Sequence, residues 1–270
     1  MSDRIQETFG LNRRPFDKNI PSELMWMDEG RQQGLDRLIQ AVECRQNALV
    51  LGEPGVGKTC VLRALRDQLS PTRFRLNYVV HVTLGRRDFY RQICYTLGVE
   101  AKATAAAMFE AIQRECAQVS SEHRQHAVLV IDEAHLLPDA TLGHLHLLAN
   151  FQWDAEPLLT LVFVGLPELH DRLRLGVHRS LLTRIHTKIE ITPSSPDMIA
   201  MYVRKRLNDA GARHEIFTAD GLSTLHELSG GVLRSVDVLA EASLRLAAVD
   251  DLTLIDRRIV RRALHHTPMA

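Results

Sequence analysis

The sequence predicts an α/β fold: a parallel β-sheet covered by helices, followed by a small domain made only of helices. Short apolar segments alternate with longer stretches of helical periodicity between about residues 47 and 191. Apolar strands joined by connections long enough for a helix are typical of a parallel sheet that is buried on both faces. The expected strands are Asn47–Leu51, Tyr78–Val82, Ala127–Ile131, Leu159–Val164 and Thr187–Ile191.

The pattern changes after the Pro-Ser-Ser-Pro turn at residues 193–196, where Ser195 or Asp197 is available to begin a helix. Only helical periodicity follows, with helices expected over residues 198–210, 219–228, 234–248 and 256–265. Before the first strand we expect a loop over residues 9–21 and a helix near residues 29–45. The expected parts are therefore an N-terminal segment (1–46), a sheet domain (47–192) and a helical domain (193–270).

The composition makes several classes of protein improbable. The 33 basic and 33 acidic residues balance, so net charge gives no general attraction to nucleic acid or membranes. The cysteines at 44, 60, 94 and 116 form no Cys-x-x-Cys pair and are expected to be reduced, buried thiols. The chain begins without the apolar segment of a signal peptide, and no apolar run approaches the ~20 residues that span a bilayer. We expect a soluble, cytoplasmic protein that makes no membrane contact.

Residues 52–59 read Gly-Glu-Pro-Gly-Val-Gly-Lys-Thr, the P-loop pattern of proteins that bind nucleoside triphosphates. Its glycines let the backbone curl so that N–H groups face the phosphates, and the positive end of the next helix points the same way. Lys58 is expected to reach the β- and γ-phosphates, and Thr59 to offer its hydroxyl to Mg²⁺. An apolar strand precedes the pattern and an amphipathic helix follows it, as such a loop requires. The expected ATP-binding residues are Gly52, Glu53, Pro54, Gly55, Val56, Gly57, Lys58, Thr59 and Cys60.

A second group of residues ends the third expected strand. Four apolar residues at 128–131 lead into Asp132 and Glu133, at the edge where ligands bind in open α/β sheets. Asp132 is expected to hold Mg²⁺, directly or through water, and Glu133 to act as the general base on the attacking water. The alternative is a pair of solvated acids at the start of a helix.

Three other readings of the motifs are weaker. Asp132-Glu133-Ala134-His135 also matches the box of a helicase group, but the chain has room for only one of the two tandem domains those enzymes need. A GTPase is disfavoured because no Asn-Lys-x-Asp signature follows the strands. His144 and His146 lie two residues apart on an expected helix and face different directions, which argues against a zinc site.

The chain resembles AAA+ ATPases of the ExeA-like group, which includes secretion ATPases and the transposition ATPases of the TniB, TnsC and MuB kind. The resemblance covers nearly the whole chain and implies a five-stranded sheet, a helical lid, and ATP bound between subunits. Besides the P-loop, its motifs are Phe9-Gly10-Leu11, Pro15-Phe16, Ile131-Asp132-Glu133-Ala134-His135, Val164-Gly165-Leu166-Pro167-Glu168-Leu169, Leu182-Thr183-Arg184-Ile185 and Gly230-Gly231-Val232-Leu233-Arg234.

The resemblance also implies roles for single residues. Arg184 falls at the position of the arginine finger that reaches a neighbouring subunit's γ-phosphate, with an ordinary surface arginine as the alternative and Arg179 as a rival. Arg234 matches the lid arginine that closes on the phosphates. Phe16 and its neighbours are expected to lie against the adenine, although a plain core-packing role is the alternative. Leu166 departs from the polar residue usual after the fourth strand, so hydrolysis is slow or another group orients the water.

Three functions follow from the resemblance. The first is a transposition regulator that forms a ring or filament on duplex DNA and activates a transposase, with or without a separate target-selection protein. The others are a secretion ATPase and a nucleotide switch that binds only protein. The chain ends at Ala270, whereas secretion members usually continue into a membrane span and an envelope-binding domain, and this favours transposition.

Pairs of adjacent arginines are the residue-level observation that indicates DNA binding. Arg86 and Arg87 follow the second expected strand, where loops of ring or spiral ATPases face the central channel. Two adjacent arginines could contact phosphates without reading sequence. The alternative is a solvated pair, and the arginines at 257–262 are a second candidate surface. We expect ATP hydrolysis that is slow and stimulated by assembly or DNA.

Overall fold

The computed structural model describes residues 2–17, 21, 25–151 and 156–268. The chain folds as two compact units. The sheet unit comprises residues 30–53 and 61–191, and the helical unit comprises residues 1–29, 54–60 and 192–270. One boundary between the units lies between Ile191 and Thr192. Residues 1–29 belong to the helical unit, and residues 30–46 belong to the sheet unit.

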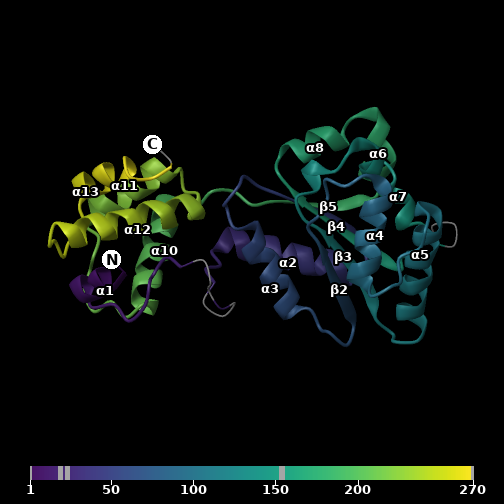
Figure 1. Cartoon of the computed structure of the whole chain (residues 1–270), viewed down its shortest axis with the longest axis horizontal. Helices are drawn as coiled ribbons and strands as arrows, with labels where there is room; N and C mark the ends of the chain where they lie inside the picture. The colour runs from purple at the N-terminus through teal and green to yellow at the C-terminus, as the bar shows by residue number, and fades with distance from the viewer. Residues whose placement is uncertain (1, 18–20, 22–24, 152–155, 269–270) are drawn as a thin grey trace. The chain divides into compact units, whose positions relative to one another are not determined.

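The sheet unit contains a parallel sheet of five strands, in the order β2-β3-β4-β1-β5. Helices α4 and α5 pack together against β2 and β3 (Figure 1). Alternate residues of β3 point to opposite faces, and all of them are buried, so the strand is covered on both sides. The strands are β1 (Asn47–Leu51), β2 (Phe74–Val79), β3 (His126–Ile131), β4 (Leu159–Gly165) and β5 (Ile185–Glu190).

The longer helices in or bordering this unit are α2 (Glu29–Glu43), α3 (Lys58–Gln68), α4 (Arg86–Leu97) and α5 (Ala105–Ser121). Short helical segments connect the last three strands. They are η2 (Ala134–Leu136), α6 (Asp139–Leu142), α7 (Leu145–Leu148), α8 (Glu168–Leu173), η4 (Gly176–His178) and α9 (Arg179–Leu182).

The second strand is the main correction to the expected sheet. It was expected over residues 78–82, but β2 begins at Phe74 and ends at Val79, paired along the whole of β3. Polar residues broke the apolar pattern on this edge strand. Arg75 forms an ion pair with Glu115 at 2.8 Å, and the side-chain amide of Asn77 donates to the carbonyl of Val128 at 3.4 Å. These partners satisfy polar groups that a sequence pattern counts against a strand.

The helical unit contains the four expected helices, each shifted by no more than two residues at either end. Ser195 begins the first of them, because its hydroxyl accepts a hydrogen bond from the amide of Met198 at 3.4 Å. The sequence did not predict the N-terminal helix, whose Ile5 and Phe9 are buried in the apolar cluster of this unit. The helices are α1 (Ser2–Phe9), α10 (Pro196–Asp209), α11 (Ala219–Ser229), α12 (Leu233–Val249) and α13 (Arg257–Leu264).

The cysteines are free, and they differ in exposure. Cys94 and Cys116 are buried as expected, whereas Cys60 is half-buried and Cys44 is exposed at the end of α2. Within the described parts of the chain, every helix is too short or too polar to cross a membrane.

Candidate nucleotide site

The P-loop connects the buried strand β1 to helix α3. The amide of Gly52 donates to the carbonyl of Gly165 at 3.2 Å, which fixes the start of the loop beside the end of β4. Gly55 and Gly57 have φ angles of 82° and 106°, a backbone region that glycine adopts without strain. Helix α3 then begins at Lys58, so the positive end of an 11-residue helix follows the curled loop. Thr59 is exposed, and its hydroxyl is a suitable oxygen donor for Mg²⁺. This local geometry fits a nucleotide phosphate with Mg²⁺.

Within the helical unit, Arg234, the expected lid arginine, is the second residue of α12 and lies beside Gly55 of the P-loop. The amide of Arg234 donates to the carbonyl of Gly55 at 3.2 Å. A Cβ atom at Gly55 would lie 2.7 Å from the Cβ of Arg234, so this approach requires glycine. The side chain of Arg234 is exposed and therefore accessible to a ligand.

Two glycines set the direction of that helix. Gly230 and Gly231 have φ angles of 60° and 74° and connect α11 to α12. A Cβ at Gly231 would lie 2.2 Å from the carbonyl oxygen of Ser194, whereas nothing lies within 4 Å of the same position at Gly230. Gly231 is thus fixed by a close backbone contact, and Gly230 only by its φ angle.

The two carboxylates at the end of β3 have different surroundings. Asp132 is 8% exposed, and its Oδ1 accepts the amide of Glu133 at 2.9 Å. Its Oδ2 accepts the hydroxyl of Tyr78 at 2.5 Å. Glu133 has a φ of 52° and a side chain that is 47% exposed. A left-handed backbone at a residue other than glycine costs about 1–3 kcal/mol and is often found at functional sites. The structure thus holds Asp132 in place and leaves Glu133 open to solvent.

Tyr78 was missed as a site residue. The sequence treats it only as the first residue of a strand, whereas the true β2 places it opposite Val130, two residues before Asp132. Partial burial, followed by the hydrogen bond and the charge of Asp132, raises the pKa of Tyr78 far above its usual range. Tyr78 therefore remains a neutral hydroxyl that donates to the carboxylate. The register of β2 on β3 is the signal that would have revealed it.

His135 lies beside both the expected base and the apolar residue after β4. Its Nδ1 is 3.5 Å from Oε2 of Glu133 and accepts the amide of Leu166 at 3.4 Å. Arg172 fixes the same segment, because its guanidinium donates to the carbonyls of His135 and Leu137 at 2.5 and 2.8 Å. The structure thus places an imidazole next to Glu133, where Leu166 supplies no polar side chain.

The two candidate arginine fingers lie just before β5. Arg184 is half-buried, and its Nη1 donates to the carbonyl of Ser180 at 3.1 Å. Its own carbonyl accepts the side-chain amide of Asn47 at 3.1 Å. Arg179, the rival, is exposed at the first residue of α9.

Phe16 lies in the core of the helical unit. It is 7% exposed, and the guanidinium of Arg206 lies over its ring, 5.7 Å from the centroid. The alternative core-packing role is therefore what the structure describes for Phe16, and an adenine contact stays a prediction.

Two pairs of adjacent arginines begin helices. Arg86 and Arg87 are the first residues of α4, and both are exposed. Arg257 and Arg258 are the first residues of α13 and are likewise exposed. The rest of the α13 cluster is paired with acids: Arg262 lies 2.9 Å from Asp250, and Arg261 lies 3.8 Å from Glu227.

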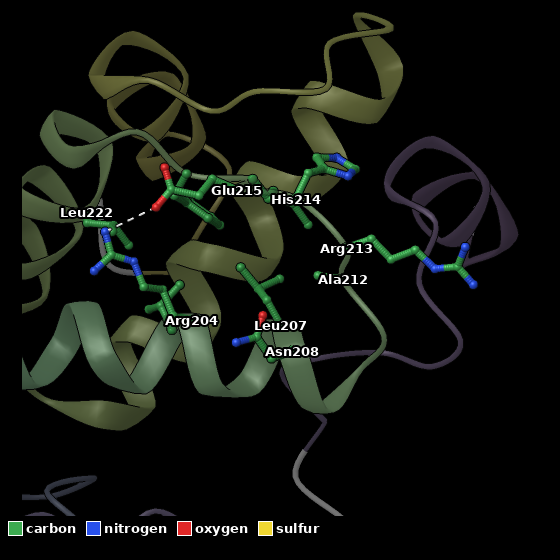
Figure 2. Close-up of a pocket in the computed structure, with 11 residues that line it drawn as sticks. Arg204, Leu207, Asn208, Ala212, Arg213, His214, Glu215 and Leu222 are labelled. Atoms are coloured by element: carbon green, nitrogen blue, oxygen red, sulfur yellow. Dashed lines mark hydrogen bonds and ion pairs between the residues drawn. The ribbon is translucent and has the colours of Figure 1, made fainter.

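A pocket in the helical unit lies between α10 and the segment leading to α11 (Figure 2). Apolar residues, including Leu207 and Phe217, line it, and Arg204 and Glu215 form an ion pair across it at 3.4 Å. None of the site residues expected from the sequence lines this pocket.

Comparisons with known proteins identify similar sequences and structures. Residues 42–173 match a family model described as "AAA domain". The chain is 34% identical over 239 residues to General secretion pathway protein A of Aeromonas hydrophila, which covers 87% of this chain. It is 24% identical to an uncharacterized HTH-type transcriptional regulator of Methanocaldococcus jannaschii, over 81% of this chain. The chain spans 43% and 62% of the lengths of these two curated relatives.

Solved structures resemble the fold at low sequence identity. The Cdc6p protein of Pyrobaculum aerophilum has a TM-score of 0.70 at 19% identity, covering 93% of this chain and 70% of its own. The ORC1 protein of Aeropyrum pernix in complex with DNA has a TM-score of 0.64 at 17% identity, covering 92% and 68%. Residues 42–173 thus match an AAA domain, and the chain is similar in sequence to the secretion protein and in fold to Cdc6 and ORC proteins. A domain of this kind binds and hydrolyses a nucleotide, typically with Mg²⁺.

Proposed function

We propose that this chain is the ATPase of a mobile element. In its ATP-bound form it would assemble on duplex DNA, mark target DNA and activate a partner transposase, with or without a target-selection protein. The observation that carries the DNA part is the exposed pair Arg86 and Arg87 in the first turn of α4. A ring or filament of identical subunits would place this pair at regular intervals along a phosphate backbone.

In this proposal each site residue has a separate chemical role. The ammonium of Lys58 offsets phosphate charge, while the Thr59 hydroxyl and the Asp132 carboxylate supply oxygens that hold Mg²⁺. Bound Mg²⁺ neutralises charge that develops on the phosphate oxygens. Glu133 takes the proton of the attacking water, and its 47% exposed side chain leaves room for that water.

Turnover would be slow in a single subunit. Leu166 cannot orient water, and Arg184 is proposed to act on the nucleotide of a neighbouring subunit. Assembly or DNA binding would bring that arginine into place and so stimulate hydrolysis. The amide of Arg234 donates to the carbonyl of Gly55 in the P-loop. Arg234 would therefore respond to whether the P-loop holds ATP.

A second candidate function is a secretion ATPase. It is favoured by the 34% identity to General secretion pathway protein A over 87% of this chain. A secretion ATPase would not need to bind DNA when it holds ATP. A switch that binds only protein would not need to do so either. Nucleotide-dependent DNA binding therefore separates the proposals.

The salt dependence of DNA binding tests the contact residues. We expect the affinity for labelled duplex DNA, measured by fluorescence anisotropy with a non-hydrolysable ATP analogue, to fall log-linearly with salt. The slope should be roughly −0.9 per phosphate neutralised. Arg86→Ala with Arg87→Ala should flatten this slope and weaken every sequence alike, while ATP binding is unchanged.

The matched control is Arg257→Ala with Arg258→Ala, because that pair also begins a helix and is exposed. It should leave the slope unchanged. If this control flattened the slope and the Arg86 and Arg87 variant did not, the DNA contact would lie on α13.

A further inference from the structure

Tyr78 makes a specific contact with the carboxylate proposed to hold Mg²⁺. It lies near the end of the edge strand β2, and its hydroxyl donates to Oδ2 of Asp132 at 2.5 Å. The two residues are 54 positions apart in the sequence and are brought together by the pairing of β2 with β3. The contact is therefore a consequence of the strand register and not of local chain geometry.

Both oxygens of Asp132 are held by donors of the protein. Oδ1 accepts the amide of Glu133, and Oδ2 accepts Tyr78, so rotation of the carboxylate would break at least one hydrogen bond. Each carboxylate oxygen has about two lone-pair sites, and one donor on each oxygen leaves capacity for a metal ion or its water. The carboxylate is thus oriented without being saturated.

The hydroxyl of Tyr78 has little to do for the core. The residue is 44% exposed, so its ring is partly in water and phenylalanine would fill the same space. A partly exposed hydroxyl could hydrogen-bond to water if the carboxylate were absent, so this bond adds little to folding. Its effect is concentrated on Asp132, which is 8% exposed.

We propose that Tyr78 is a positioning residue for metal binding: its hydroxyl holds the Asp132 carboxylate in the orientation that receives Mg²⁺. This inference rests on the role of Asp132 proposed above. Hydrogen bonds to charged groups are strong enough for their loss to change an equilibrium by tenfold or more, and partial exposure reduces that effect. Loss of the hydroxyl should therefore raise the Mg²⁺ requirement roughly three- to tenfold.

The test uses Tyr78→Phe in the full chain and measures the affinity for a fluorescent ATP analogue across a MgCl₂ titration and in EDTA. In EDTA, Tyr78→Phe should bind the analogue with the wild-type affinity. In the titration, it should need a higher Mg²⁺ concentration to reach half of the gain in affinity that Mg²⁺ produces. Tyr90→Phe is the matched control, because Tyr90 is 2% exposed and its hydroxyl has no hydrogen-bond partner among the residues described. It should show the wild-type Mg²⁺ requirement. Thermal unfolding of both variants checks that they fold.

Asp132→Asn separates the two levels of the proposal. If Asp132→Asn raises the Mg²⁺ requirement and Tyr78→Phe does not, the positioning role of Tyr78 is wrong while the metal role of Asp132 stands. If Asp132→Asn also leaves the requirement unchanged, both are wrong. A lower Mg²⁺ requirement in Tyr78→Phe would overturn the inference too, because the hydroxyl would then compete with the metal.

Discussion

The sheet unit and the helical unit place their acidic residues in different ways. In the sheet unit, Asp132 and Glu133 follow the last residue of a buried strand, and Glu133 has a half-exposed side chain. In the helical unit, Asp237 is half-buried and accepts the hydroxyl of Tyr202, a member of the apolar core, at 2.5 Å. Carboxylates at a strand end lie at the sheet edge where ligands bind, whereas Asp237 is bonded to a buried hydroxyl and joins parts of its unit.

The buried network of the helical unit joins segments that are distant in sequence. Arg206 donates to the hydroxyl of Tyr202 at 2.9 Å and to the carbonyls of Pro15 and Asp17 at 2.6 and 2.9 Å. Helix α10 thereby holds the N-terminal segment that contains Phe16. The sheet unit thus contains Asp132 and Glu133, whereas the helical unit contains Arg234 and residues 54–60 of the P-loop.

The largest expected effects separate binding from chemistry. Lys58→Ala should abolish ATP binding, because the phosphates lose a cation at close range. Glu133→Gln should still bind ATP, but its turnover should fall by a factor on the order of 10²–10⁴. The glutamine amide fills the same volume as the carboxylate but cannot act as a base. Equilibrium binding of a fluorescent nucleotide and single-turnover hydrolysis measure the two effects. Failure of Glu133→Gln to bind ATP would show that Glu133 is not the base.

A mixing experiment tests whether Arg184 acts between subunits. Arg184→Ala and Lys58→Ala should each be inactive alone, and their mixture should recover part of the wild-type turnover. The recovery would come from interfaces that combine the intact lysine of one variant with the intact arginine of the other. Arg179→Ala, mixed in the same way, serves as the control for the rival arginine. Activity in a verified monomer that does not depend on concentration would remove the role in trans.

The paired glycines before α12 give the next effect, on stability. Gly231→Ala should destabilise the helical unit by about 4 kcal/mol or more, since its Cβ would lie 2.2 Å from a backbone oxygen of Ser194. Gly230→Ala meets nothing within 4 Å and should cost only the left-handed strain of about 1–2 kcal/mol. Urea unfolding followed by circular dichroism gives both values. Equal losses would mean that the contact with Ser194 is not formed.

The smallest effect is a pH dependence with opposite signs in the two units. Burial lowers the pKa of His126 in the sheet to about 4, so the unfolded chain binds the extra proton and stability rises from pH 4 to 6.5. Burial raises the pKa of Asp237 to about 6, so the folded chain holds an extra proton between pH 4 and 6. The contribution of Asp237 to the free energy of unfolding therefore falls as the pH rises through this range. Each contribution is at most about 3 kcal/mol.

Substitutions that cannot titrate isolate these two contributions. Relative to the wild type, His126→Gln should remove the rise and Asp237→Asn should remove the fall, measured by urea unfolding at several pH values between 4 and 7. A wild-type slope retained in either variant would assign the pH dependence to other groups.

In both units the sequence reveals motifs more readily than contacts that depend on strand register or helix packing. The P-loop and the acids after β3 could be predicted because residue type, spacing and an apolar strand all coincide. Tyr78 could not, because its role depends on the register of an edge strand whose polar residues hid its true start at Phe74. Helix α1 and the burial of Phe16 depend on contacts with α10 and α12. Local periodicity does not predict contacts between segments so far apart in the sequence.

In the proposed function, nucleotide state, reported by Arg234, controls the binding of DNA by Arg86 and Arg87. The most direct test compares binding of a labelled duplex, at low salt, with a non-hydrolysable ATP analogue and with ADP. We expect tight binding by the wild type only with the analogue, and equally weak binding in both states for Arg234→Ala. Equal DNA affinity of the wild type in both nucleotide states, or an Arg234→Ala protein that still distinguishes them, would contradict it.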